Sequence, residues 1–147
     1  MLTPTDLLSL PASRELDALV AEKVMGWHAL RDGHCAECEA MIKEGTLMMS
    51  DPQGLVGVVP DYSTSIAAAW EVVEKLCPPN PAECVYEFSL ERCLDGCHVA
   101  KFGPHESGHI DGSAPLAICR AALKTVSAPI PIHSHGTIRS GKIQGVP

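Results

Sequence analysis

The sequence predicts a single layered α/β sandwich with the order α-β-β-α-β-β-α, in which mostly antiparallel hairpins pack with three amphipathic helices. Two patterns predict it: one-sided helical hydrophobicity in three stretches, and two pairs of short apolar runs joined by turn signals. One-sided helices need a surface on which to bury their stripes, and a sheet supplies it. The length of 147 residues suits one domain, with a lead-in over 1–12, the domain over 13–127 and an extended or mobile tail over 128–147.

The first helix is expected to begin at Ser13, whose hydroxyl suits the N-cap position. Glu15 and Asp17 follow in the first turn, where the helix end is positive. Gly26 is a plausible stop. The apolar stripe consists of Leu16, Leu19, Val20, Val24 and Trp27.

A first hairpin is expected between this helix and the next. Leu47–Met49 and Leu55–Val59 are short apolar runs, and Asp51–Gly54 between them is a turn signal. The stretch His34–Ile42 is polar and carries two cysteines, and we assign it to no element.

The central helix lies in the stretch DYSTSIAAAWEVVEKL, Asp61 to Leu76. Ser63 or Ser65 is expected at its N-cap, and Pro78 ends it because proline has no N–H to continue the ladder. Glu71, Glu74 and Lys75 fall opposite a stripe that contains Ile66, Ala69, Trp70, Val73 and Cys77.

A second hairpin and a third helix follow. Cys84–Glu91 alternates with the period of a half-buried strand, Leu94–Gly96 makes the turn, and His98–Phe102 returns. After a loop over 103–112, Ser113 caps the third helix. The residues that we expect to be buried across the three helices are Leu19, Val20, Ile66, Trp70, Val73, Leu116 and Leu123.

The composition limits the classes of function. The formal charge of −7 argues against a nucleic-acid-binding surface, and no 18-residue apolar run predicts a membrane span. Residues 1–15 lack the basic and apolar regions of a secretory signal. Seven cysteines, an odd number without an export signal, are expected to be reduced thiols in a cytosol.

Residues His105–His109 match the pattern H-E-x-x-H of zinc hydrolases. That chemistry needs both histidines on one helical face, with Glu106 beside the metal-bound water. Here Pro104 precedes the motif and Gly108 lies inside it, which predicts a loop. We therefore interpret the match as coincidental and assign no catalytic residues.

Two cysteine clusters are the other candidates for chemistry. Cys35 and Cys38 form a C-x-x-C pair, and Cys93 and Cys97 flank the turn of the second hairpin. Both clusters lie next to turns, which can meet at one end of a sheet, so the four thiols are candidate ligands of a structural zinc. The irregular spacing favours free thiols. A redox function is disfavoured because no strand is evident that leads into a helix starting at the pair.

Three segments carry a resemblance to a known family: ELDALVAEKVMGW (Glu15 to Trp27), PDYSTSIAAAWEVVEKL (Pro60 to Leu76) and APLAICRAALKTV (Ala114 to Val126). In order and spacing they resemble the phage ABA sandwich domain family. The resemblance implies an ABA-type α/β sandwich and a bacteriophage or prophage source, hence the cytoplasm of a bacterial host. It implies no activity and no site residues.

Three classes of function remain open. The first is a small non-enzymatic accessory protein that binds a host or phage protein, although ordinary solubility would also explain the acidic charge. The second is a module stabilised by structural zinc at the four cysteines. The third is a hydrolase that uses His105, Glu106 and His109. No other cofactor is expected, and the metal content of untagged protein would separate the classes.

Overall fold

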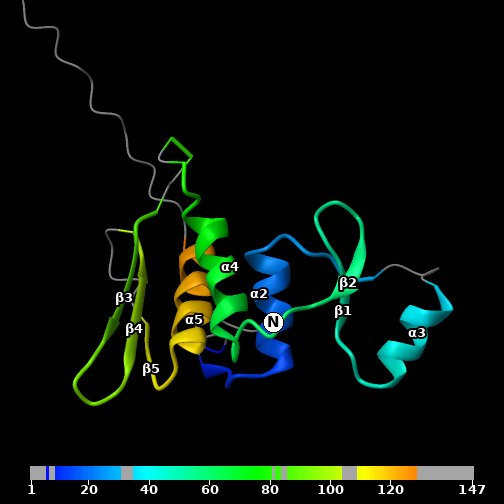
Figure 1. Ribbon diagram of the computed structural model, residues 1–147, viewed down its shortest axis with the longest axis horizontal. Coiled ribbons are helices and arrows are strands. Elements are labelled where there is room, and N and C mark those ends of the chain that lie inside the picture. The colour runs from blue at the N-terminus through cyan, green and yellow to red at the C-terminus, as the bar shows by residue number, and fades with distance from the viewer. Residues whose placement is uncertain are drawn as a thin grey trace, which may run out of the picture.

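The fold is a mixed α/β arrangement with two small antiparallel sheets (Figure 1). It is seen in a computed structural model that describes residues 6, 9–30, 35–80, 82–83, 86–103 and 109–128. The predicted tail from 129 onward therefore lies outside the described residues. The elements, in chain order, are α2 (Arg14–Lys23), α3 (Ala36–Lys43), β1 (Met48–Ser50), β2 (Val56–Val58), α4 (Ile66–Leu76), β3 (Phe88–Arg92), β4 (His98–Phe102), β5 (His109–Asp111) and α5 (Ala114–Ser127).

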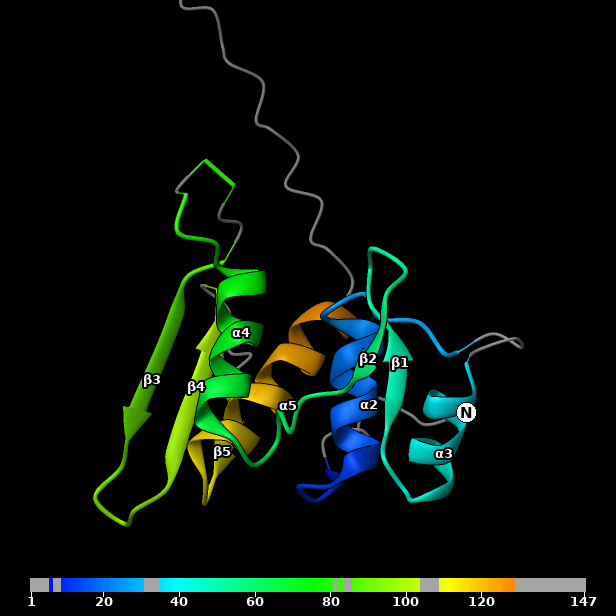
Figure 2. The ribbon, with the colours of Figure 1, turned by 45° about the vertical axis from the view of Figure 1, so that its right-hand side comes forward.

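The larger sheet has the strand order β3-β4-β5, and α4 and α5 lie on one of its faces (Figures 1 and 2). Phe88 pairs with Phe102 and Leu90 with Ala100, so alternate residues of β3 and β4 share a face. Helix α2 packs on α5 away from the sheet. The β1–β2 hairpin lies beyond α2, and α3 forms the far end of the described molecule.

The helix starts agree with the capping residues that the sequence predicts. The hydroxyl of Ser13 accepts a hydrogen bond from the Leu16 N–H at 3.3 Å, and that of Ser113 accepts from Leu116 at 3.4 Å. Of the two serines considered for α4, Ser65 is the N-cap. Both predicted hairpins are also present, as β1–β2 and β3–β4.

Small side chains make up the contact between α4 and α5. Alanine side chains are small, so neighbouring helix axes can come close together, and the larger Val73 and Leu123 are buried in the core as predicted. Val20 is also buried as predicted, whereas Leu19 and Leu116 are half-buried at the edge of the core. The alanines buried in these two helices are Ala68, Ala69, Ala117, Ala121 and Ala122.

Two residues that we expected in the core are on the surface. Ile66 is 51% exposed and Trp70 is 45% exposed. The apolar stripe was assigned to the correct helix, but its centre lies elsewhere on the helix surface, because α4 turns Ala68, Ala69, Val72 and Val73 into the core. Trp70 is left outside this buried side and packs edge-on against Phe88 of the sheet.

The predicted order also lacks two elements of the structure. Helix α3 occupies the stretch that we left unassigned, and β5 occupies the end of the predicted 103–112 loop. Strand β5 pairs antiparallel with β4, with Ala100 opposite His109. Both elements are short, at eight and three residues, and neither displays a periodic apolar pattern.

A buried carboxylate joins α2 to the segment that leads into α4. Asp17, only 2% exposed, accepts from the Ser63 N–H at 2.7 Å and from Arg14 Nη1 at 3.0 Å. The same guanidinium donates to Asp61 Oδ1 at 2.5 Å and to the Val59 carbonyl at 2.7 Å. This cluster fixes the start of α4, and therefore the orientation of its outer face.

Candidate functional site

The outer face of α4 combines exposed apolar surface with acidic charge. Its residues recur at helical spacing and border an open hollow of about 430 Å³. We call this surface the α4 face; it consists of Ile66, Ala67, Trp70, Glu71 and Glu74.

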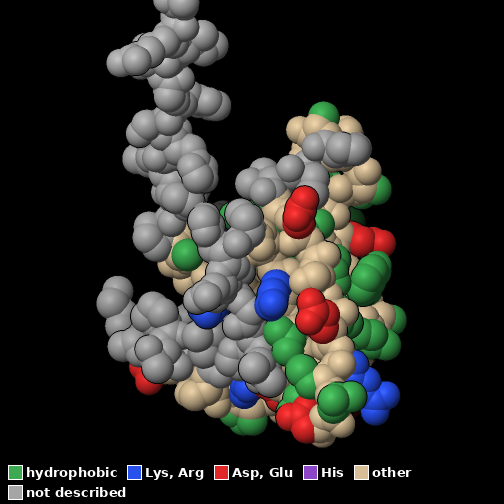
Figure 3. Space-filling model, turned by 90° about the vertical axis from the view of Figure 1, so that its left-hand side faces the viewer, with side chains coloured by type: hydrophobic (Ala, Val, Ile, Leu, Met, Phe, Trp, Pro, Cys, Tyr) green, Lys and Arg blue, Asp and Glu red, His purple; other side chains and the backbone are tan. Residues whose placement is uncertain are grey.

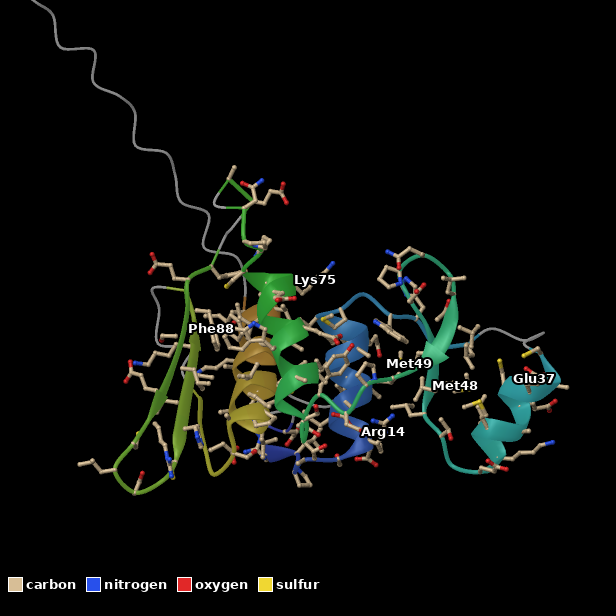
Figure 4. The ribbon with its side chains drawn as sticks, viewed as in Figure 1. Arg14, Glu37, Met48, Met49, Lys75 and Phe88 are labelled. Atoms are coloured by element: carbon tan, nitrogen blue, oxygen red, sulfur yellow. The ribbon has the colours of Figure 1, made fainter. Side chains whose placement is uncertain are left out.

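A chain of aromatic contacts supports the indole at the centre of this face. The Trp70 ring meets Phe88 edge-on, with ring centroids 5.7 Å apart and an interplanar angle of 84°. Phe88 in turn lies 4.9 Å from the ring of Phe102, which is buried. Figure 4 shows Phe88 between β3 and the helices. The indole therefore rests on the core while its outer surface faces solvent.

The charges of the α4 face are carboxylates. Glu71 and Glu74 are both exposed and lie one helical turn apart. In the view from the β3 side, hydrophobic side chains and carboxylates lie together along one edge of the molecule (Figure 3). Such a surface attracts cations, and an indole face adds a cation–π contribution. The arrangement combines features that are typical of binding surfaces.

The Cys35–Cys38 pair lies at the start of α3, on a helix end that the sequence did not predict. Cys35 is the N-cap, and its Sγ lies 2.9 Å from the Sγ of Cys38. The hydrogen bond from Cys38 lowers the pKa of Cys35, and the same bond raises the pKa of Cys38. Our argument against a redox function took both a strand and the helix that it leads into to be missing. The structure supplies the helix start at Cys35, but the described residues before it include no named strand that leads into α3.

The second cysteine pair lies at the opposite end of the molecule. Cys93 and Cys97 flank the β3–β4 turn, where the Cys93 N–H donates to the Cys97 carbonyl at 2.8 Å. The negative charge of Asp95 raises the pKa of Cys97. The two cysteine pairs, which we considered as joint candidate ligands of a structural zinc, each adjoin a different sheet and lie at opposite ends of the molecule (Figures 1 and 4). In the part of the chain that the structure describes, no group of three or more His, Cys, Asp or Glu side chains is placed to hold a metal ion.

The H-E-x-x-H segment falls mostly outside the described residues. Positions 104–108 lie outside them, and His109 is described only as the first residue of β5. Among the described residues, no helix is long and apolar enough to cross a bilayer.

A model of a protein family, described as the phage ABA sandwich domain, matches residues 18–123. The chain belongs to this family. The match includes α3, both hairpins and the α4 face, and it leaves out the first turn of α2 and the last turn of α5. The family is one of phage proteins of unknown function, which agrees with the resemblance seen in the three helical segments.

A solved structure supports the same fold. The chain is similar to a phage protein from Bacillus cereus ATCC 14579, known from a 2.0 Å crystal structure, with a TM-score of 0.54 and 22% sequence identity. The similarity covers 80% of this chain and 94% of the other. No curated protein matches the chain.

Sequence reasoning missed the α4 face because it placed Trp70 in the core. One signal could have indicated that Trp70 is exposed. The run of three alanines before it offers an alternative set of small side chains that the helix can bury. The thiol pair was found from its spacing, but its helix was not, since α3 has no buried side chains.

Proposed function

We propose that this chain is a non-enzymatic interaction domain of a phage or prophage, and that its α4 face binds a protein segment that is both apolar and basic. The observation that carries the proposal is Trp70, which is 45% exposed yet held in place by Phe88. A tryptophan that is already ordered loses little freedom when a partner covers it. Tryptophan is also enriched among the residues that dominate binding energy.

The surrounding residues specify the chemistry of the partner. Ile66 and Ala67 extend the apolar area along the helix, and this area calls for an apolar side chain in the hollow. Glu71 and Glu74 flank it and favour lysine or arginine on the partner, in agreement with the formal charge of −7. An amphipathic helix with one basic edge meets both requirements.

A direct test uses fluorescently labelled model peptides and measures their anisotropy as the protein is added. One peptide is an amphipathic Leu/Lys helix, and its counterpart has glutamate in place of every lysine. We expect the Leu/Lys peptide to bind and the Leu/Glu peptide not to bind. Substituting Trp70→Ala should weaken binding roughly tenfold or more, as for other interface tryptophans.

The charges are tested separately. The double substitution Glu71→Gln with Glu74→Gln should weaken binding and reduce its dependence on salt, because two attractive charges are removed. Leu94→Ala and Glu44→Gln are matched controls, since both residues are exposed and lie on other elements. Neither control should change the affinity.

Unfolding must be excluded as the cause of any loss. Because Trp70 is half-exposed, Trp70→Ala should cost about 1–2 kcal/mol, below the roughly 3–5 kcal/mol typical of a core aromatic. Equal binding of the two peptides, or an unchanged affinity in Trp70→Ala, would contradict the proposal. So would light scattering that shows a dimer which dissociates on Trp70→Ala, because the face would then bind a second copy of the chain.

A further inference from the structure

The first turn of α3 brings two thiols into direct contact. Cys35 adopts the extended backbone of an N-cap, with φ −68° and ψ 159°. Its Sγ accepts from the Cys38 N–H at 3.4 Å and lies 2.9 Å from the Cys38 Sγ. The positive end of the helix stabilises a thiolate at this position. A thiolate also accepts these hydrogen bonds more strongly than a thiol does.

Both sulfurs are accessible, and few contacts oppose a movement of the first turn of α3 that would bring them together. Cys35 is exposed and Cys38 is partly exposed. Helix α3 has no buried residues, so a shift in its first turn leaves the core untouched. The sulfurs need to approach by roughly 1 Å to reach the bonded distance of about 2.05 Å.

The shared hydrogen bond divides the roles of the two thiols. Donation from Cys38 to Cys35, with the backbone N–H of Cys38 as the next cause, lowers the pKa of Cys35 against the opposing charge of Glu37. The same bond, followed by burial, raises the pKa of Cys38. Since Cys35 Sγ also accepts from the Cys38 backbone N–H, we assign Cys35 as the attacking thiol and Cys38 as the thiol that loses its proton in a later step.

Two other thiols of the described chain have environments that suppress attack. The negative charge of Asp95 raises the pKa of Cys97. Burial raises the pKa of Cys119, which lies in the core. In the first turn of α3, by contrast, thiolate character and access coincide at Cys35.

We propose that Cys35 and Cys38 are a redox-active dithiol that exchanges with an accessible disulfide of another protein or of a small molecule. This activity goes beyond the binding function proposed for the α4 face. It uses a different element, and either function can fail without the other.

The exchange takes place in two steps. The Cys35 thiolate attacks one sulfur of the disulfide, a mixed disulfide forms, and the first thiolate leaves and takes a proton from water. Cys38 then loses its proton to water and attacks the Cys35 sulfur, which expels the second thiolate. The two protein thiols lose two electrons and two protons in total, and the attacked disulfide becomes two thiols.

The test equilibrates the full chain in buffers with different ratios of reduced to oxidised glutathione, then blocks free thiols and digests with trypsin. Cleavage after Arg31 and Lys43 gives a fragment whose cysteines are Cys35 and Cys38. We expect this fragment to change from doubly alkylated to internally disulfide-bonded within the range of the buffers. A fragment that stays doubly alkylated in pure oxidised glutathione would overturn the proposal.

Two single variants test the division of roles. Cys38→Ser should trap one glutathione on Cys35, because no second thiol completes the exchange. Cys35→Ser should keep the fold, since serine is a good N-cap, but should capture glutathione at Cys38 at least about threefold more slowly. Cys97→Ser is the matched control and should behave as the unmodified chain. Equal capture by the Cys35→Ser and Cys38→Ser variants would refute the assignment of Cys35 as the attacking thiol.

Two further measurements identify the kind of disulfide that reacts and test whether the thiols bind a metal instead. Insulin reduction with dithiothreitol, accelerated by the chain but not by Cys35→Ser, indicates a protein disulfide; exchange with glutathione alone indicates a small molecule. Either result supports the dithiol. A one-to-one zinc content that is lost in Cys35→Ser and protects both thiols from glutathione would overturn it.

Discussion

Helices α3 and α5 begin alike and are held in place differently. Each starts at a side chain that accepts from the backbone N–H three residues later: Cys35 for α3 and Ser113 for α5. Helix α5 then buries seven residues against α2, α4 and the larger sheet, whereas α3 buries none. In α3 the largest apolar side chains, Met41 and Ile42, remain 37% and 38% exposed.

The two helices are therefore stabilised by different kinds of interaction. Packing determines where α5 lies, so its interior tolerates little change. Helix α3 depends on local terms, namely its cap, its propensity and the Glu39–Lys43 pair, each worth about 1 kcal/mol or less. A segment held so weakly can move at low cost, which suits a site that must open and close a bond.

The largest effect that would sharpen this comparison is expected from Leu123→Ala. Leu123 is 1% exposed in α5, so its truncation should lower the free energy of unfolding by about 2–5 kcal/mol. The matched change in α3, Met41→Ala, should cost less than about 1 kcal/mol. Urea unfolding followed by circular dichroism measures both. Equal losses would mean that α3 is packed as tightly as α5.

A smaller effect is expected at the buried carboxylate. Asp17→Ala leaves the Ser63 N–H without its acceptor and should cost about 1.5–3 kcal/mol in the same unfolding assay. Asp17→Asn keeps an acceptor and should cost less. If the two variants are equally stable, the charge and hydrogen bonds of Asp17 do not hold α2 to the start of α4.

The smallest effect that we expect is a loss of folding stability as the pH rises above about 9. Burial, followed by the charge of Asp17, raises the pKa of Cys119 above its ordinary value of 9.0, so the folded state keeps a proton that the unfolded state loses. This contribution to stability is complete below about pH 9 and declines above it by about 1.4 kcal/mol per pH unit. Tyr62, whose pKa burial also raises, contributes in the same direction above its ordinary value of 10.0.

The measurement is urea unfolding between about pH 8 and pH 10.5, a range that spans the ordinary thiol pKa. Cys119→Ala should flatten the decline from about pH 9, and Tyr62→Phe should flatten it only at the upper end. Met41→Ala should leave the slope unchanged. A slope in Cys119→Ala as steep as in the unmodified chain would show that this thiol ionises as readily in the folded state as in the unfolded one.

The elements that could be predicted from the sequence are those whose signals are local and repeated. Ser13 and Ser113 were recognisable because each precedes an apolar stripe, and the β1–β2 turn because Pro52 and Gly54 interrupt two apolar runs. The mixed α/β class followed from these elements. Strand β5 was not predictable, because its three residues acquire their role only by pairing with β4.

The candidate sites were harder to predict, for two separate reasons. Periodicity locates the apolar side of α4 to within one or two positions, and the close contact through Ala68 and Ala69 decides that Trp70 is outside. For the thiols, spacing found Cys35 and Cys38, but their contact depends on a helix without an apolar face. Which cysteines meet in space is a tertiary property that spacing alone did not determine.

The alanines between α4 and α5 have a consequence for the surface. A buried alanine side chain has no rotamers to lose, so the contact is ordered without cost in side-chain entropy. The same property leaves no flexible group that could absorb an added methyl, and a larger residue at Ala69 or Ala121 must separate the helix axes. Trp70 belongs to α4 and Phe88 to the sheet, so any shift of α4 relative to the sheet would change the contact between the two rings.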